Sequence, residues 1–254
     1  MNTKLYEAIF KRKSFHLFLG VGSDTLSQDD LDGIEAAYDT FDALYPDIKT
    51  AIRIVPAANV NFKRDAEYCI LIYSEKRPNY LLNAGYIGQQ LDLWLVSHDI
   101  GSLWYGIGKP DMQKYEDLDF VIMLAIRKVT DAAKYRKDMF KAKRKELSDV
   151  WSGDTLGETA NIARFAPSAC NTQPWYIENN GGALTVYRYR KPGKRSIMPA
   201  AKVAYFNRID IGIYLCILEL CMQKNDIKFE KELFTDDGGD EEYTKVAVYK
   251  TERR

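Results

Sequence analysis

The 254-residue chain repeats a pattern of helix and strand at an offset of 127 residues. His98-Asp99-Ile100 follows one long amphipathic segment, and Asn225-Asp226-Ile227 follows a second one. The same offset pairs three further positions: Gly85 with Gly212, Leu91 with Leu218, and Leu93 with Leu220. Self-similarity at a fixed period indicates repeated structural units. It predicts two related halves packed around a pseudo-two-fold axis. Coincidental leucine spacing in two unrelated helices is the alternative.

Apolar periodicity assigns the elements of each half. Helices are expected over 4–11, 31–44, 79–98, 140–152, 157–165 and 207–224. Strands are expected over 51–55, 67–73, 120–126, 183–189 and 245–250. The pattern predicts an α+β fold with residues 1–137 as the first half and 138–254 as the second, joined in one compact unit. The charged segment 131–144 between them is interpreted as a solvated helix face.

Composition excludes several classes of protein. The 36 Lys and Arg residues balance the 36 Asp and Glu residues, so we expect no nucleic-acid partner. No apolar run is long enough for a membrane helix, and the N-terminal residues contain no apolar signal segment. The four cysteines form no CxxC motif and are interpreted as free thiols, which favours the cytoplasm. Two histidines and no HExxH motif predict no metal site.

Three segments carry possible chemistry. Arg12-Lys13-Ser14 offers two cations and a hydroxyl, which can bind a phosphate. Residues 166–175, APSACNTQPW, form a loop of small polar residues stiffened by two prolines, suited to a planar heteroaromatic ligand. Residues 101–110, GSLWYGIGKP, lack the third glycine of a dinucleotide-binding motif and are expected to approach a flat ligand instead.

These segments resemble motifs of the nitroreductase family of FMN flavoproteins. APSACNTQPW resembles the APS-x-x-N-x-QPW signature, and Arg12-Lys13-Ser14 after a short helix resembles the N-terminal R-x-S element. GSLWYGIGKP resembles the segment that passes beside the flavin, and Lys134-x-Arg136 resembles the basic phosphate clamp. The resemblance implies a nitroreductase-like fold with antiparallel-rich sheets.

The order of the motifs differs from that of ordinary family members, in which two subunits share each flavin. Here Ser168 lies 154 residues after Ser14, in the other half of the chain. The first half has no QPW-like loop near Thr40, and Lys143-Arg144-Lys145 in the second half lacks the serine of R-x-S. The chain therefore resembles the tandem branch of the family, which implies a fused pseudodimer with a single FMN site and a functional monomer.

The resemblance implies a set of cofactor-binding residues. They are Arg12, Lys13, Ser14, Asn59, Trp104, Tyr105, Gly106, Lys134 and Arg136 from the first half, and Pro167, Ser168 and Asn171 from the second. The cations would hold the phosphate and ribityl chain. The loop around Pro167 and Ser168, called the Pro-Ser loop, would cap the ring. Asn61 is the alternative to Asn59, and His16 stands at the place of the family's second basic residue.

The implied function is hydride transfer from NADH or NADPH, through flavin N5, to a nitro compound, quinone or similar small acceptor with ping-pong kinetics. No side chain is assigned as a catalytic acid, base or nucleophile, because the flavin supplies the chemistry. Cys170 is interpreted as a structural thiol. The alternatives are another flavin reaction on the same fold, such as reductive dehalogenation or flavin breakdown, and an FMN storage or sensing protein without turnover.

Overall fold

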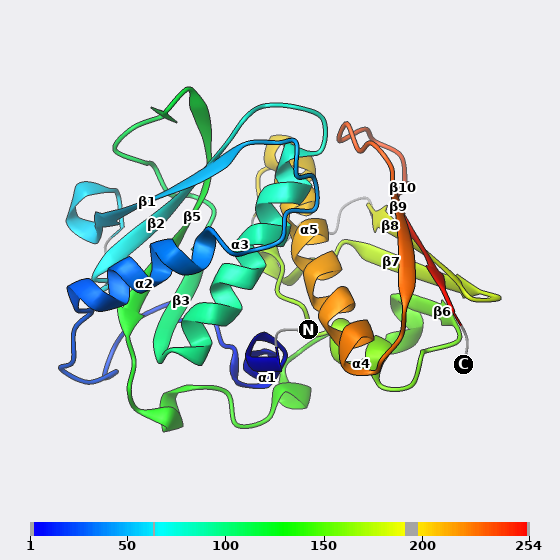
Figure 1. Ribbon diagram of the computed structural model, residues 1–254, viewed down its shortest axis with the longest axis horizontal. Helices are drawn as coiled ribbons and strands as arrows, with labels where there is room; N and C mark the ends of the chain where they lie inside the picture. The colour runs from blue at the N-terminus through cyan, green and yellow to red at the C-terminus, as the bar shows by residue number, and fades with distance from the viewer. Residues whose placement is uncertain (1–2, 63, 191–197, 253–254) are drawn as a thin grey trace.

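Two sheets flank two central helices in the structure, a computed structural model that describes residues 3–62, 64–190 and 198–252 (Figure 1). The central helices are α3 (Tyr80–Ser97) and α5 (Ala200–Lys224). The first sheet has, in spatial order, β1 (Thr50–Pro56), β2 (Tyr68–Ser74), β5 (Leu118–Lys128) and β3 (Ile100–Tyr105), and β4 (Lys114–Tyr115) pairs with β5. The second has β6 (Trp151–Gly153), β7 (Trp175–Asn180), β8 (Ala183–Tyr189), β10 (Tyr243–Thr251) and β9 (Phe229–Leu233).

The two sheets share one strand order. In the first, β1 and β2 precede α3, and β5 lies between β2 and β3. In the second, β7 and β8 precede α5, and β10 lies between β8 and β9. The strands of each set pair antiparallel, whereas the additional strand β6 pairs parallel with β7. The expected α+β fold with antiparallel-rich sheets is confirmed, and the common origin of the halves stays a prediction.

The central helices cross at two glycines, and the contact is reciprocal. A Cβ atom on Gly85 would collide with the backbone of Ile209, and one on Gly212 would collide with the backbone of Leu82. The offset of 127 residues relates Leu82 to Ile209 and Gly85 to Gly212. Only glycine allows two helix backbones to approach this closely. The crossing therefore has the reciprocity expected of a self-complementary, two-fold interface.

The ends of the central helices are also alike. Asp99 follows α3 with φ +58°, and Asp226 follows α5 with φ +54°. Left-handed backbone at the residue after the cap is a common way for a helix to end, and Asp tolerates it better than most residues.

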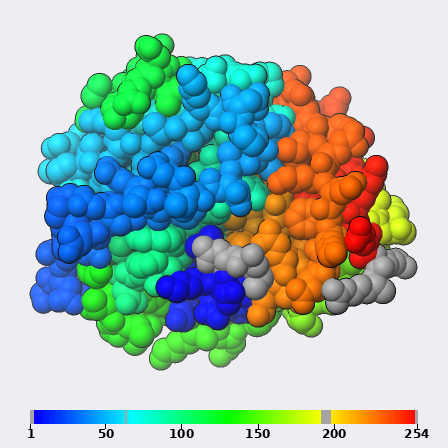
Figure 2. Space-filling view, viewed as in Figure 1, coloured from blue at the N-terminus to red at the C-terminus, as the bar shows by residue number. Residues whose placement is uncertain are grey.

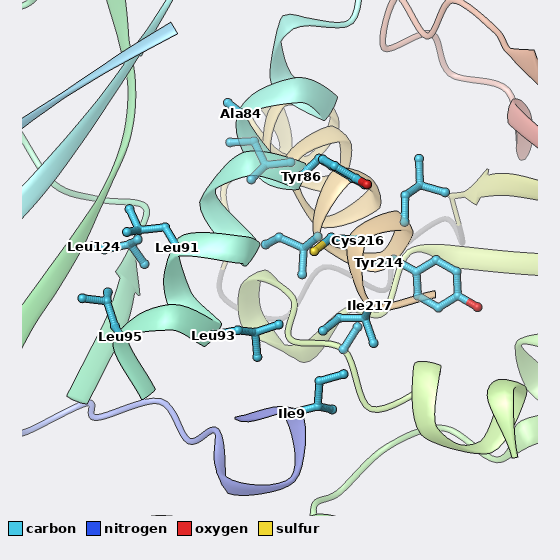
Figure 3. Packing of buried hydrophobic residues seen from close by; sticks show 14 of the residues in the cluster. Ile9, Ala84, Tyr86, Leu91, Leu93, Leu95, Leu124, Tyr214, Cys216 and Ile217 are labelled. Atoms are coloured by element: carbon cyan, nitrogen blue, oxygen red, sulfur yellow. The ribbon is translucent and has the colours of Figure 1, made fainter. Parts of the chain in front are cut away.

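The core fills the space between the two central helices and continues beneath both sheets. Figure 3 shows Leu93 of α3 near Ile217 of α5 and Ile9 of the N-terminal helix α1 (Thr3–Lys11), and Leu91 of α3 beside Leu124 of β5. All five side chains are buried. α1 packs against both α3 and α5, so the N-terminal segment lies where the two halves meet. In the space-filling view, the surface of the first half meets that of the second along a broad seam (Figure 2).

Most of the expected elements are present, with corrected bounds. The helix expected over 31–44 is α2 (Gln28–Tyr38), which begins with a capping box at Ser27. Beyond its end, Gln90 of α3 binds the backbone of Asp42 through both its amide oxygen and its amide nitrogen. The helix expected over 157–165 is the shorter α4 (Thr159–Ala163). The first part of GSLWYGIGKP, to which no element was assigned from the sequence, belongs to strand β3.

The helix predicted over 140–152 is wrong. This segment contains two short 3-10 turns, Met139–Lys141 and Leu147–Asp149, and then β6. Trp151 pairs with Ile177 in the second sheet, so the segment is stretched across the junction between the halves. Tertiary pairing has overridden the weak helical periodicity of this charged run.

Within the part of the chain that the structure describes, no helix combines the length and the apolar character needed to cross a membrane.

Candidate functional site

A cavity of about 280 Å³ lies between the two halves of the chain. The first half contributes a wall formed by Arg12, Ser14, His16, Arg64, Leu103, Trp104, Tyr105, Gly106, Ile107 and Ile122. The second half contributes Pro167, Ser168, Ala169, Cys170, Met198, Pro199, Phe206, Ile209, Asp210 and Ile213. The cavity is thus lined by three segments predicted from the sequence: the Arg12–Ser14 element, the glycine-containing strand end and the Pro-Ser loop.

The first wall is built on strand β3. Ser14 forms a parallel bridge with Ser102, and the Phe15 backbone N–H donates to the Ser102 carbonyl oxygen at 3.0 Å. This pairing holds the Arg12–Ser14 element beside Trp104. A Cβ on Gly106 would collide with the Phe206 ring of α5, so the absence of a side chain lets the two halves close at this point.

Asp92, which the sequence analysis did not single out, organises this wall from α3. Its Oδ2 accepts a hydrogen bond from Arg12 Nε at 2.7 Å and another from Trp104 Nε1 at 3.2 Å. Its Oδ1 accepts from Ser102 Oγ. Asp92 is fully buried and Arg12 is 8% exposed. One carboxylate therefore fixes the end of α1 and two residues of β3. A single acid within the apolar run LDLWLV was the signal that could have revealed it.

The second wall is a strained loop. Cys170, Asn171 and Gln173 all have positive φ, between 48° and 55°. Residues other than glycine occupy this region at a cost, so the surroundings must hold the loop in place. The Gln173 side chain accepts from Lys145 N at 2.9 Å, and its backbone N–H donates to Ser168 Oγ at 2.9 Å. Ser168 thus uses an acceptor position of its hydroxyl within the loop and keeps the hydroxyl hydrogen for another partner.

Several predicted residues lie outside the cavity wall. Lys13 Nζ donates to the Lys134 carbonyl oxygen at 2.8 Å, and Arg136 Nε donates to the Arg12 carbonyl oxygen at 3.1 Å. Asn171 Oδ1 accepts from Arg144 Nη1 at 2.9 Å, so this amide braces the loop. Asn59 is exposed at the end of the 3-10 turn Ala57–Asn59. The alternative, Asn61, accepts from the Lys109 backbone N–H.

A smaller cavity of about 20 Å³ adjoins the first, because Arg12 and Pro167 line both. Arg136 and Arg144 complete its polar side. Burial and the neighbouring guanidinium groups of Arg12, Arg136 and Arg164 lower the pKa of Arg144 to about 10. Among the described residues, the buried atoms Arg12 Nη2 and Arg144 Nε have no hydrogen-bond partner. Clustered cations with free N–H groups can bind an anion, so Arg12, Arg136 and Arg144 form a candidate anion site.

Arg144 belongs to the charged segment expected to be a solvated helix face. The structure corrects that expectation, because the Arg144 side chain turns inward toward Phe165, whose carbonyl oxygen accepts from Nη2 at 3.2 Å.

The cavity also contains residues not assigned from the sequence. Arg64 lies over the Tyr105 ring at 5.8 Å. His16, which the sequence did not assign as a ligand contact, lines the same wall. Asp210 is 3% exposed, and burial raises its pKa to about 8. Its spacing with Phe206 and Ile213 on α5 was a helical signal that could have been read from the sequence.

The described residues contain no cluster of three or more His, Cys, Asp or Glu that could hold a metal ion.

Comparison with known proteins agrees with the motifs and the fold. Residues 4–222 match the model of a family described as "Putative TM nitroreductase". The crystal structure of a putative nitroreductase from Thermotoga maritima is similar over 97% of this chain and 93% of that one, with 18% identity and a TM-score of 0.57.

A second structure, from Parabacteroides distasonis, is described as a putative NADH dehydrogenase/NAD(P)H nitroreductase. It covers 61% of this chain and 99% of its own, with 13% identity and a TM-score of 0.44. Comparison with curated proteins gave no match. The family model spans most of the chain, and the chain therefore belongs to this nitroreductase family of oxidoreductases.

Proposed function

We propose that this chain binds one FMN in the cavity between its halves and transfers hydride from NADH or NADPH to a small nitroaromatic, quinone or related acceptor. The observation that supports this most directly is the composition of the cavity wall. Ser14 and the Trp104–Gly106 segment come from one half, and the Pro167–Cys170 loop comes from the other. These are the segments that resemble the flavin-binding motifs of the family.

The residues present fit the two ends of an FMN molecule. The anion site of Arg12, Arg136 and Arg144 has two buried guanidinium nitrogens, Arg12 Nη2 and Arg144 Nε, without partners among the described residues, which suits a phosphate. The larger cavity has a mostly apolar and aromatic wall with few polar groups, which suits a planar ring. Arg144 would thus extend the predicted set of Arg12, Ser14, Lys134 and Arg136.

Bound FMN would supply hydride transfer at its N5 atom. The chain's own residues would bind, orient and shield. Asp92 fixes Arg12 and Trp104, so the wall is arranged before a ligand enters. Donor and acceptor would use the same cavity in turn, which gives ping-pong kinetics.

The duplicated arrangement supports one site per chain and a functional monomer. The shared strand order and the reciprocal glycine contacts support the proposal of a fused pseudodimer with halves 1–137 and 138–254. A second R-x-S element and a second QPW loop are both missing from the sequence, so the other pseudo-symmetric position lacks its motifs.

The test is a visible spectrum of the purified chain, loaded with FMN, before and after NADH or NADPH is added under nitrogen. We expect about one FMN per chain, a flavin-loaded species near 29.2 kDa by light scattering, and bleaching by the nicotinamide. Bound FMN that is not bleached would support the storage or sensing alternative. A ratio near two would contradict the single site.

A further inference from the structure

Asp210 is a carboxyl group placed on an otherwise apolar helix face. Phe206, Ile209 and Ile213 line the same cavity from α5, at the spacing of one helical stripe. The Asp210 side chain is 3% exposed. The helix is fixed at this level, because the Ile209 carbonyl lies against Gly85 of α3. Asp210 therefore holds a set position and has little freedom to turn toward solvent.

The two oxygens of this carboxyl differ in their partners. Oδ1 accepts a hydrogen bond from the Ala169 backbone N–H at 2.9 Å, which ties α5 to the Pro-Ser loop. Oδ2 is buried and has no hydrogen-bond partner among the residues that the structure describes. A buried polar atom without a partner is destabilising, because its interaction with water is lost and not replaced. Because Asp210 lines a ligand-sized cavity, a bound ligand is the nearest source of the missing partner.

Burial, rather than the charges around the cavity, favours the neutral form of this acid. The other titratable groups on its wall are Arg12, His16, Arg64, Tyr105 and Cys170. Arg12 is paired with Asp92, and the pKa of the Cys170 thiol is raised by burial and, to a smaller extent, by the nearby Asp210. Burial is the largest influence on Asp210 and raises its pKa to about 8, whereas the Ala169 N–H opposes this rise. At pH 7 the carboxyl is therefore mostly protonated, and its free oxygen can donate.

We propose that Asp210 contacts the molecule held in this cavity, donating a hydrogen bond from Oδ2 to a carbonyl, nitro or ring-nitrogen acceptor atom of that molecule. The inference rests on the proposed function for the identity of the occupant. Both FMN and its electron acceptor carry such atoms, and the binding experiments below distinguish them.

The first test follows the carboxyl itself. Infrared difference spectra between wild type and Asp210→Asn, recorded on the full chain from pH 5 to pH 10, isolate this one group. We expect a protonated-carboxyl band in the wild type that disappears with a midpoint near 8. Asp226→Asn, which changes an exposed acid beyond the same helix, should retain the band. Absence of the band at pH 6 would overturn the proposal.

The second test follows binding. FMN is titrated into the apoprotein, and 1,4-naphthoquinone into the FMN-loaded protein, at pH 7 and pH 9. For the ligand that Asp210 contacts, wild-type affinity should fall about tenfold between these values, because only the protonated acid donates. Asp210→Asn keeps the shape and a donor but does not titrate, so its affinity should change far less, whereas Asp226→Asn should behave as the wild type.

The outcomes separate the two proposals. If wild type binds FMN but wild type and Asp210→Asn show the same pH dependence for both ligands, Asp210 makes no such contact and the proposed function still stands. If wild type binds no FMN, the proposed function fails, and this inference fails with it.

Discussion

Arg12 and Asp92 form a buried ion pair across 80 positions of sequence, with Arg12 Nε 2.7 Å from Asp92 Oδ2. The pair joins the end of α1 to the middle of α3. Because Trp104 and Ser102 also donate to Asp92, the pair holds one wall of the candidate flavin cavity. Arg12 thus has a structural partner at Nε, whereas its Nη2 has no partner within residues 3–62, 64–190 and 198–252.

Asp92→Ala should destabilise the chain by about 3–5 kcal/mol, because removal of one partner leaves the other charge buried and unpaired. Urea denaturation of the apoprotein measures this loss. The matched control is Asp111→Ala, which removes the partner of Arg53 in a partly exposed pair and should cost no more than about 1 kcal/mol. Equal losses in the two variants would show that the buried pair is not structurally important.

Arg144→Ala should weaken FMN binding about 10- to 100-fold and leave riboflavin binding unchanged. A hydrogen bond to a charged group contributes about 1.5–3 kcal/mol, and riboflavin lacks the phosphate that would receive it. Fluorescence titration of the apoprotein with each flavin gives both affinities. Lys141→Ala removes an exposed cation from the same segment and serves as the control. A parallel loss for FMN and riboflavin would place Arg144 elsewhere than at the phosphate.

Ser168→Phe should lower FMN affinity by at least tenfold, because the larger ring would enter the cavity from the second half. Its free energy of unfolding should change little, since Ser168 is only half-buried. Ser148→Phe makes the same substitution at an exposed position away from the cavity. Unchanged FMN affinity in Ser168→Phe would mean that the flavin contacts the first half alone.

Gly85→Ala and Gly212→Ala should each lower stability by about 1–3 kcal/mol or more, because the added methyl group meets helix backbone rather than a movable side chain. Thermal unfolding of the two variants checks this. Gly33→Ala on α2 is the control, since its Cβ would make only an ordinary contact with Trp94. That change should be neutral or stabilising, by up to about 1 kcal/mol. If only one of the two substitutions lowered the unfolding temperature, the two sides of the helix crossing would contribute unequally to stability.

Local patterns in the sequence predicted most of the elements and the segments that line the site. The strand 183–189 and the helix 79–98 follow directly from apolar periodicity, and the structure has them as β8 and α3. The resemblance to nitroreductase motifs assigned the Arg12–Ser14 element and the loop around Ser168 to one ligand although 154 residues separate their serines, and both line one cavity. Motifs of this kind are readable because their chemistry is carried by neighbouring residues.

The tertiary structure decided what each charged side chain faces. Arg144 lies in a run of cations that looks solvated, yet the extended path of its segment turns it toward Arg12 and Arg136. Asn59 was predicted to reach the flavin, with Asn61 as the alternative, and neither is among the residues that line the cavity. Asp92 is the one acid of α3 and Asp210 is one of two acids in α5, and the role of each depends on the groups that the fold brings to it. Burial, pairing and pKa arise from groups distant in sequence, so the sequence determined the elements and motifs, and only the packing of the two halves determined the electrostatics of the site.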